Sequence, residues 1–308
     1  MSAYKNILVT VSMPAYNAAK YIGEAIESIL NQSHRNFELV IIDDGSTDET
    51  CQVIQRYHDP RIIFLSHQYN HGLVATRNEI TRKARGKYIA FLDADDKASP
   101  DRLEKQIVFL ENNSIDICGT DHWVLYDYDG TIGASKLSHS DKDIRALMTI
   151  YSPLCNPSIM GRTEVFKDNL YRAEYGHAED YCFWVDLALK GHSFSNLKER
   201  LMVYRVHATQ TSITHQAAAR QIFLDTQQRY LQGLGISLAY TPRPMPWHER
   251  VQSAPRFLKQ VQQIIGKTSF FVNWQIYARF QWRSNGILRT PFIRLERLII
   301  ALWARFVL

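Results

Sequence analysis

Three aspartates lie close together at the end of an apolar run in "YIAFLDADDKASPDRLEKQ", residues 88–106. Asp93, Asp95 and Asp96 repel one another, and the stretch "DADD" contains no Lys or Arg to neutralise them. Crowded carboxylates are tolerated around a cation, and ligand sets made only of oxygen suit Mg²⁺ or Mn²⁺. Such ions use one or two protein carboxylates together with substrate phosphates, so the cluster predicts a metal-bound diphosphate. The alternative is a solvated or helix-capping turn, although Ser99 already offers an N-cap before Pro100.

Two further strand ends carry groups that suit a nucleotide. "VIIDDGSTDET" places Asp43 and Asp44 after an apolar run, and "MPAYN" places Tyr16 after another, where its ring can stack on a flat base. In parallel α/β sheets the carboxyl ends of the strands meet at one edge, where ligands bind. A row of stacking ring, hydrogen-bond acceptor and metal site matches the base, ribose and diphosphate of a nucleotide. The chain has neither GxGxxG nor GxxxxGK[ST], so we expect metal to hold the diphosphate.

The elements that must position these groups alternate between strand and helix patterns. Strands are predicted at 6–13, 37–44, 61–67 and 87–93, and helices at 18–33, 45–57, 72–84 and 100–113. Asn17 is the expected N-cap of the first helix, and Ser46 with Glu49 has the spacing of a capping box for the second. Strands separated by helices of this length predict an α/β fold with a mainly parallel sheet and helices on both faces.

Further sheet and helix signals follow this core. We expect more sheet at 116–127, a hairpin or mobile loop at 127–140, a strand within 157–166, a helix at 177–191 that ends at Gly191, and a last strand at 197–207. The four cysteines, Cys51, Cys118, Cys155 and Cys182, are widely spaced, which argues against a disulfide scaffold or a zinc site and fits a reducing compartment. The apolar run before Pro14 is too short for a signal peptide, so we expect a cytoplasmic catalytic part.

The motifs "PAYN", "IIDDGSTD", "NHGLVATRN", "FLDADD", "AED" and "YRVHATQTS" occur in this order. Together they resemble the family 2 inverting glycosyltransferases with the GT-A fold, and the resemblance covers roughly residues 7 to 215. The segment from "HAEDYCFWVDLALKG" through "LMVYRVHATQTS" looks most like bacterial β-1,3-N-acetylglucosaminyltransferases of lipooligosaccharide or capsule assembly. The resemblance therefore implies a Rossmann-like, mixed but mainly parallel sheet in a catalytic domain of residues 1–215, followed by a helical region of residues 216–308.

The resemblance also implies roles for single residues. Tyr16 would stack on uracil, Asp44 would accept a hydrogen bond from the uracil N–H, and Asp93 would contact ribose. Asp95, with His207, would bind Mn²⁺ or Mg²⁺ on the diphosphate, although His207 could equally be a structural histidine. The other implied substrate-binding positions are Pro14, Asn17, Asp43, Arg77, Ala94 and Glu179. Arg77 and Arg205 could each neutralise phosphate or serve only as ion-pair partners.

Asp180 is the implied catalytic base. Sugar transfer from a nucleotide diphosphate needs a neutralised leaving group and a base at the acceptor hydroxyl. From the residues alone, Asp180 could equally cap the helix that it opens. One base with direct attack at the anomeric carbon gives inversion, and thus a β-linkage from an α-linked donor.

The expected function is therefore metal-dependent transfer of a sugar from a UDP-sugar to a hydroxyl of a cell-surface glycan. GlcNAc is the preferred donor sugar, by resemblance alone, with Glc or Gal as alternatives. Three other functions remain open: transfer to a polyprenyl phosphate, which needs no base; a non-catalytic module that binds nucleotide sugar or glycan; and Mg²⁺-dependent nucleotidyl transfer.

The C-terminal part of the chain differs in charge from the rest. From Ala254 onward the sequence has nine Lys or Arg and one acid, Glu296, which gives this part a net charge of +8. Because the whole chain has a net charge of +5, residues 1–253 have a net charge of −3. The last 15 or so residues form an amphipathic pattern that is too short to span a bilayer. We expect it to hold the enzyme on the anionic inner face of the cell membrane. The alternatives are packing on the domain or a dimer contact; no nucleic-acid-binding module is visible.

Overall fold

The structure is a computed structural model that describes residues 4–210, 216–236, 247–269, 272–273 and 275–276. The chain divides into two compact units, residues 1–139 with 154–222, and residues 140–153 with 223–308. The second unit thus takes a segment from the middle of the sequence, which the expected boundary at residue 215 does not include. The assignment of catalysis to residues 1–215 stays a prediction.

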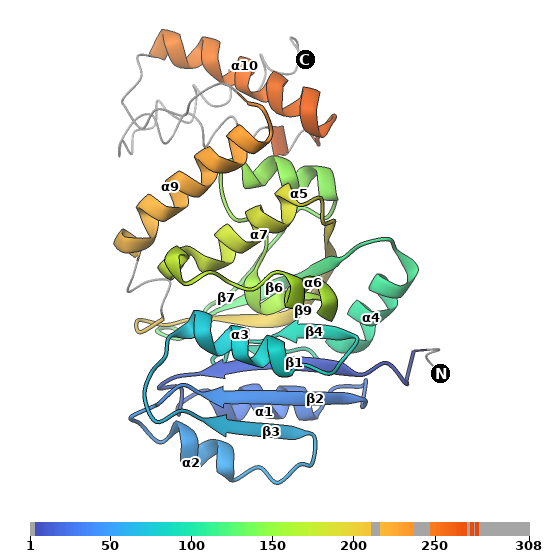
Figure 1. Cartoon of the computed structure of the whole chain (residues 1–308), viewed down its shortest axis with the longest axis vertical. Helices are drawn as coiled ribbons and strands as arrows, with labels where there is room; N and C mark the ends of the chain where they lie inside the picture. Colours follow the sequence, from blue (N-terminus) through green and yellow to red (C-terminus); the bar gives the residue numbers. More distant parts are fainter. Residues whose placement is uncertain (1–3, 211–215, 237–246, 270–271, 274, 277–308) are drawn as a thin grey trace. The chain divides into compact units, whose positions relative to one another are not determined.

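A single mixed sheet organises the first unit (Figure 1). Its parallel part has the order β3-β2-β1-β4, formed by β1 (Val9–Ala15), β2 (Phe37–Asp43), β3 (Ile62–Ser66) and β4 (Tyr88–Phe91). The order then continues β8-β6-β9-β5, with β8 (Met160–Arg162), β6 (Ile117–Tyr126), β9 (Phe194–Val206) and β5 (Lys97–Ala98). This arrangement confirms the expected mixed α/β sheet.

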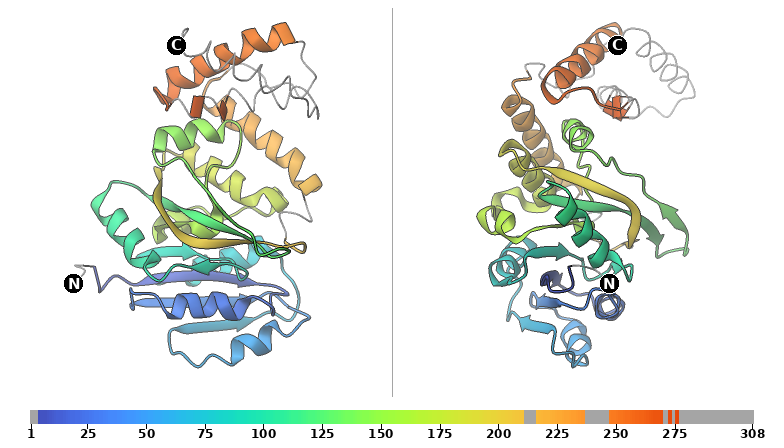
Figure 2. Two further views of the ribbon diagram at one scale, coloured as in Figure 1. Left: turned by 180° about the vertical axis from the view of Figure 1, so that it is seen from behind. Right: turned by 90° about the vertical axis from the view of Figure 1, so that its right-hand side faces the viewer.

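The second half of the sheet is where antiparallel pairs enter. β8 runs antiparallel to both β4 and β6, whereas β6 and β9 lie side by side and parallel (Figure 2). β7 (Ile132–Ala134) pairs antiparallel with β6, so residues 127–131 form the turn of a hairpin. This confirms the hairpin that the polar, glycine-containing stretch at 127–140 predicted.

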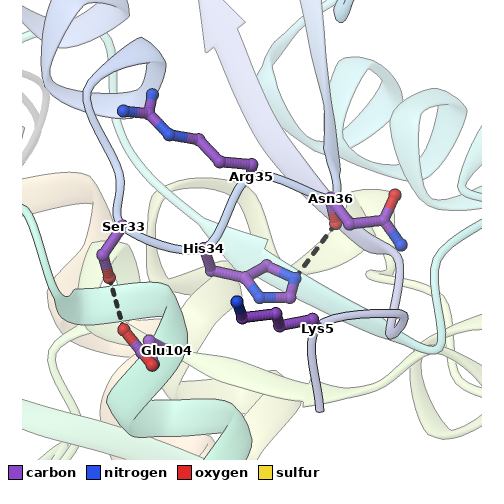
Figure 3. A pocket seen from close by; sticks show the side chains of 6 residues that line it. All are labelled: Lys5, Ser33, His34, Arg35, Asn36 and Glu104. Carbon is purple, nitrogen blue, oxygen red and sulfur yellow. Dashed lines mark hydrogen bonds between the residues drawn. The ribbon is translucent and has the colours of Figure 1, made fainter. Parts of the chain in front are cut away.

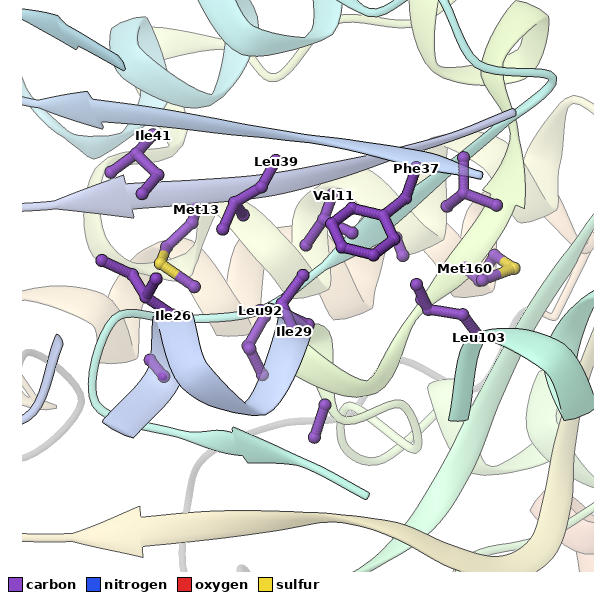
Figure 4. Packing of buried hydrophobic residues seen from close by; sticks show 14 of the residues in the cluster. Val11, Met13, Ile26, Ile29, Phe37, Leu39, Ile41, Leu92, Leu103 and Met160 are labelled. Atoms are coloured by element: carbon purple, nitrogen blue, oxygen red, sulfur yellow. The ribbon is translucent and has the colours of Figure 1, made fainter. Parts of the chain in front are cut away.

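Helices cover both faces of the parallel strands because side chains alternate along each strand. α1 (Ile22–Leu30) places Ile26 and Ile29 against Val11 and Leu39, and all four side chains are buried (Figure 4). The neighbouring residues of β2 point to the opposite face, where Val40 and Ile42 pack with Ile80 of α3 (Leu73–Lys83). The apolar spacing in the sequence thus translates directly into two helical layers.

The remaining helices have the following bounds. The first unit contains α2 (Thr50–Gln55), α4 (Arg102–Asn112), α6 (Thr163–Asp168), α7 (Glu179–Leu189) and two 3₁₀ turns, η1 (Asn156–Ser158) and η2 (Ala173–Ala178). The second unit contains α5 (Asp141–Met148), most of α9 (Gln216–Gly233) and α10 (Trp247–Ile265), joined by a separate core that includes Leu147, Leu231 and Phe257. Among the described helices none has both the length and the apolar character needed to cross a bilayer. The predicted amphipathic end of the chain lies outside the described residues.

Three predicted N-caps are wrong. α1 begins at Ile22, and Asn17 instead has a left-handed φ of 49° and accepts a hydrogen bond from the Thr47 backbone N–H. The Ser46 hydroxyl bonds to Asp43 before α2 begins, so no capping box forms. Ser99 likewise precedes α4 by more than one residue. The side chains of Asn17 and Ser46 thus stabilise turns through hydrogen bonds and do not cap a helix.

Candidate active site

Three neighbouring strands bring the predicted nucleotide-binding groups to one edge of the sheet. Ala15 at the end of β1 lies opposite Asp43 at the end of β2, and β4 pairs with β1 on its other side. Tyr16, which follows β1, is 49% exposed and so is accessible for stacking. The structure thus places side by side the strand ends that carry Tyr16, Asp44 and the aspartate cluster.

The three clustered aspartates contact different partners. Asp93 faces an arginine and Asp95 faces a histidine. Asp93 Oδ1 lies 3.2 Å from a guanidinium nitrogen of Arg77. Asp95 Oδ2 lies 2.8 Å from His207 Nε2, so the turn after β4 meets the residue that follows β9. This pairing joins the two residues that the sequence analysis assigned to a metal.

The third aspartate, Asp96, is buried and has a structural role. One of its oxygens accepts the Arg205 backbone N–H at 2.8 Å, while the other has no hydrogen-bond partner. Burial, followed by the charges of Asp95 and Asp93, raises the pKa of Asp96 well above its usual range. The Arg205 side chain donates to the Asp95 carbonyl and pairs with Asp127 and Glu24. Arg205 is therefore an ion-pair partner that ties β9 to the aspartate turn.

Arg77 connects the two acidic parts of the site. It is buried on α3, and its guanidinium contacts Glu179 Oε1 at 2.6 Å and Asp93 Oδ1 at 3.2 Å. Glu179, the first residue of α7, is also buried. Arg77 therefore holds the strand end that carries Asp93 against the helix that carries Asp180.

Asp180 lies in the first turn of α7 but does not cap it, because the N-cap position belongs to Ala178. Its carboxylate accepts the Tyr181 backbone N–H at 2.6 Å, and the residue remains partly exposed. Loss of hydration and the charge of Glu179 raise the pKa of Asp180 to about 6. A carboxyl with such a pKa is ionised at neutral pH yet basic enough to take a proton. Trp184, in the second turn of the same helix, is fully buried in the core.

Asp44 is held by a loop that the sequence analysis did not single out. Its carboxylate accepts from His67 Nδ1 at 2.7 Å and from the backbone N–H groups of His71 and Gly72 at 2.9 and 2.8 Å. Burial alone would raise the pKa of Asp44, but these hydrogen bonds outweigh it and lower the pKa. The sequence did hold a signal for His67, because this residue directly follows β3 and strand ends of a parallel sheet meet at one edge.

The side chains of Asp44, His67 and His71 are of types that bind metals, and their ligand atoms lie within 4.8 Å of one another. Hydrogen bonds already account for this grouping. His67 Nδ1 faces Asp44 at 2.7 Å and its Nε2 faces Glu79 at 3.0 Å, so both ring nitrogens are engaged by carboxylates. The grouping is therefore a hydrogen-bonded cluster that holds Asp44 at the strand edge.

The other predicted substrate-binding residues lie near this edge in supporting positions. Pro14 is within β1, paired with Ile42, and Ala94 is buried in the aspartate turn. Asp43 is buried and bonded to Ser46. Together with Asn17, which bonds across to the turn after β2, these residues shape the turns at the strand ends.

Tyr21 and Asp127 lie far apart in the sequence but contact each other beside His207, and no sequence motif indicated this contact. The Tyr21 ring lies 4.8 Å from the His207 ring, and its hydroxyl donates to Asp127 at 2.8 Å. Asp127 belongs to the β6–β7 hairpin and also pairs with Arg205. The hairpin therefore supports the residue that faces Asp95.

A separate hollow of about 380 Å³ lies at the other end of the parallel strands (Figure 3). It is lined by Lys5, Ser33, His34, Arg35, Asn36 and Glu104. Lys5 and Asn36 precede β1 and β2, so this hollow opens at the edge opposite the aspartates. It is no part of the candidate site.

The chain resembles glycosyltransferases over most of the first unit and beyond. The family model described as Glycosyl transferase family 2 matches residues 10–169. A glycosyltransferase of Haemophilus influenzae is 34% identical over 248 residues, which cover 75% of this chain and 76% of the relative. A longer glycosyltransferase of Rickettsia felis is 33% identical over 198 residues, 64% of this chain but only 33% of the relative.

A third relative has a more specific name. The Escherichia coli UDP-Glc:alpha-D-GlcNAc-diphosphoundecaprenol beta-1,3-glucosyltransferase WfaP is 32% identical over 205 residues, 67% of this chain and 80% of WfaP. Among solved structures, S. aureus TarS 1-349 in complex with UDP-GlcNAc has a TM-score of 0.58 and 16% identity, covering 97% of this chain and 92% of TarS. The mannosyltransferase PcManGT of Pyrobaculum calidifontis, in complex with GDP-Man and Mn²⁺, has a TM-score of 0.53 and 14% identity, covering 97% and 87%. At these identities the two structures show a shared fold.

The Arg77 bridge generates a prediction about stability. Arg77→Gln leaves Asp93 and Glu179 without their common cation, so we expect the free energy of unfolding at pH 7 to fall by about 3–5 kcal/mol. At pH 5 the loss should be smaller, because protonation relieves the repulsion among the orphaned carboxyls. Urea unfolding at the two pH values measures both effects. Arg82→Gln, an exposed arginine on the same helix, is the matched control and should change little. An equal loss at both pH values would contradict this account.

Proposed function

Because the chain belongs to glycosyl transferase family 2, we propose that it transfers a sugar from a UDP-sugar to a hydroxyl of a cell-surface glycan, with inversion of configuration. The observation that carries this proposal is the Arg77 bridge, in which one buried guanidinium joins Asp93 to Glu179, the neighbour of Asp180. A donor-binding edge and a candidate base are thereby fixed in one rigid arrangement.

The donor end of the site suits a uridine nucleotide. Tyr16 offers an accessible ring for stacking, and Asp44 is an ionised acceptor for a base N–H. Asp93, at the next strand end, would contact the ribose. The structural relative TarS is described in complex with UDP-GlcNAc, which supports a UDP-sugar as donor. UDP-GlcNAc is the preferred donor, and WfaP, named for UDP-Glc, makes UDP-Glc the next candidate.

The Asp95 and His207 pair fits a divalent metal. A carboxylate oxygen and an imidazole nitrogen 2.8 Å apart are donors that Mn²⁺ or Mg²⁺ accept, with Mn²⁺ favoured by the imidazole. His207 Nδ1 lies 3.0 Å from Thr209 Oγ1, which orients the ring so that its Nε2 faces Asp95. When bound, the ion would neutralise charge that develops on the diphosphate. Asp95 and His207 would hold it and orient the diphosphate.

Asp180 is the proposed general base. It is partly exposed, its pKa is raised to about 6, and the Glu179–Arg77 pair fixes the start of its helix. It would accept the proton of the acceptor hydroxyl as that oxygen attacks the anomeric carbon and the bond to the diphosphate breaks. Direct attack by one nucleophile inverts the anomeric centre. The acceptor class rests on relatives such as WfaP, whose name specifies a GlcNAc-diphosphoundecaprenol acceptor.

The reaction class is tested by a donor screen. With UDP-GlcNAc, UDP-Glc, UDP-Gal or UDP-GalNAc and Mn²⁺, we expect slow release of UDP from one donor, and none with EDTA. Asp95→Ala should lose this release, whereas Asp168→Asn, an exposed carboxylate of α6, should retain it. Coupled detection of UDP and of inorganic diphosphate measures the outcome. Release of diphosphate would indicate nucleotidyl transfer, and absence of metal-dependent UDP binding would sink the proposal.

The role of Asp180 is tested by pH. Because a base must be deprotonated, kcat/KM of the wild type should fall roughly tenfold per pH unit below about 6, the pKa of Asp180. Asp180→Asn should lower kcat by about 10²–10⁴-fold and remove this acidic limb. The measurement is a rate profile from pH 5 to 8, with UDP binding as a control for folding. Full activity of Asp180→Asn would favour a polyprenyl phosphate acceptor, which is already ionised.

We further propose that the basic C-terminal part, nine Lys or Arg against one acid, holds the enzyme on the inner face of the cell membrane. The full chain should then sediment with vesicles that contain anionic lipid, and its binding should weaken as salt rises from 0.1 to about 0.5 M, because screening shortens the range of the attraction. Neutral vesicles are the control. Equal binding to neutral and anionic vesicles would exclude this electrostatic mode.

A further inference from the structure

His67 occupies a position that the reaction described above does not use. It follows β3, and its two ring nitrogens face two carboxylates: Nδ1 lies 2.7 Å from Asp44 Oδ1, and Nε2 lies 3.0 Å from Glu79 Oε2. The side chain is only 12% exposed. The three residues come from the ends of two strands and from α3, so their alignment is a product of the fold.

The chemistry of the two partners fixes the protonation state of His67. An ionised carboxylate can only accept hydrogen bonds, so each ring nitrogen must carry a hydrogen to satisfy its partner. A neutral imidazole has one such hydrogen and the imidazolium has two. The geometry therefore requires the cation, and charge-assisted bonds of this kind are stronger than neutral ones.

The two oxygens of Asp44 are held unequally. Oδ1 accepts from His67 Nδ1 and from the His71 backbone N–H, whereas Oδ2 accepts from the Gly72 backbone N–H. The Thr76 side chain also acts on this carboxylate and helps to lower its pKa. These contacts fix the direction of both oxygens, and Oδ2 carries the fewer of the three hydrogen bonds from His67 and the loop backbone.

The loop that provides these donors is closely packed. A Cβ added to Gly45 would lie 2.5 Å from the Tyr69 carbonyl carbon, so only glycine lets the loop approach the turn after β2. The His67 backbone N–H also donates to the Asp43 carbonyl at 2.8 Å. Loop and carboxylate thus fix each other, with His67 as their side-chain link.

We propose that His67 is a positioning residue for base recognition: as an imidazolium held by Glu79, it orients Asp44 so that Oδ2 receives the imide N–H of uracil. This inference rests on the proposed use of a UDP-sugar. It also accounts for selectivity, since N3 of cytosine is an acceptor that an ionised, fully oriented carboxylate repels.

Protonation of His67 makes nucleotide binding depend on pH. The groups that face His67 are Asp44, Glu79, Lys83 through its contact with Glu79, and His71, whose ring stacks on it at 4.4 Å. The bond to Asp44 comes first in raising the pKa of His67 above 6.5, against the opposing effect of burial. The charge is therefore present below the raised pKa and is lost as pH rises through it, which weakens the hold on Asp44.

The test is the dissociation constant for UDP with Mg²⁺ present, from pH 6 to 9, by calorimetry. His67→Gln keeps the size and one donor but never the charge, so we expect roughly tenfold weaker binding at pH 6 and a gap that closes at high pH. Because the terminal phosphate of UDP also titrates in this range, the readout is the difference between wild type and variant. His58→Gln, an exposed histidine elsewhere, should match the wild type throughout.

A second variant separates positioning from a loss of folding. Glu79→Gln removes one carboxylate but leaves His67 in place, so affinity at pH 6 should stay close to that of the wild type, while the midpoint of the pH dependence moves to lower pH. CDP should bind weakly to all variants. An unchanged His67→Gln, or the same pH dependence in His67→Gln and the wild type, would overturn this inference alone. No UDP binding by the wild type would overturn the proposed function with it.

Discussion

The mutual repulsion of three closely spaced carboxylates, of which Glu179 is buried, is the constraint on which the site depends, and Arg77 offsets it. Asp93, Glu179 and Asp180 gather around one guanidinium that is itself buried. Removing such charges from water costs several kcal/mol each, and only close opposite charges and hydrogen bonds compensate. The same bridge fixes α7 relative to the end of β4. Electrostatic neutralisation and geometric alignment are therefore one interaction.

The mixed half of the sheet serves the same end. β9 runs beside β6 and delivers His207 to Asp95, while Asp96 and Arg205 bind the strand to the aspartate turn. The hairpin after β6 contributes Asp127, which holds Tyr21 against the His207 ring. The parallel strands alone would supply only the edge that carries Tyr16, Asp44 and Asp93. The added strands supply the residues that contact Asp95 and Asp96.

The pKa values of two carboxyl groups at this site are shifted in opposite directions. Asp44 is surrounded by donors that lower its pKa, so it remains an acceptor. Asp180 lies beside another carboxylate and loses hydration, which raises its pKa to about 6. The two environments therefore shift the pKa values of two aspartates apart.

The sequence alone determined most of the strands and helices and which candidate residues stand at the strand ends. Apolar spacing predicted the strands at β1 to β4 and the helices α1 and α3, and acidic turns after strands identified Asp44, Asp93 and Asp95, because these patterns are local. Glycine and polar residues at 127–140 predicted a hairpin or a mobile loop, and the pairing of β7 with β6 decided for the hairpin. The N-caps at Asn17, Ser46 and Ser99 were wrong because capping residues also bond to other turns, and sequence cannot tell which partner is near. Only the tertiary structure decided that Arg77 joins Asp93 to Glu179, that Asp96 is buried apart from its neighbours, and that His67 lies between Asp44 and Glu79. Each of these depends on contacts between residues from 12 to 109 positions apart, and such contacts exist only once the sheet has formed.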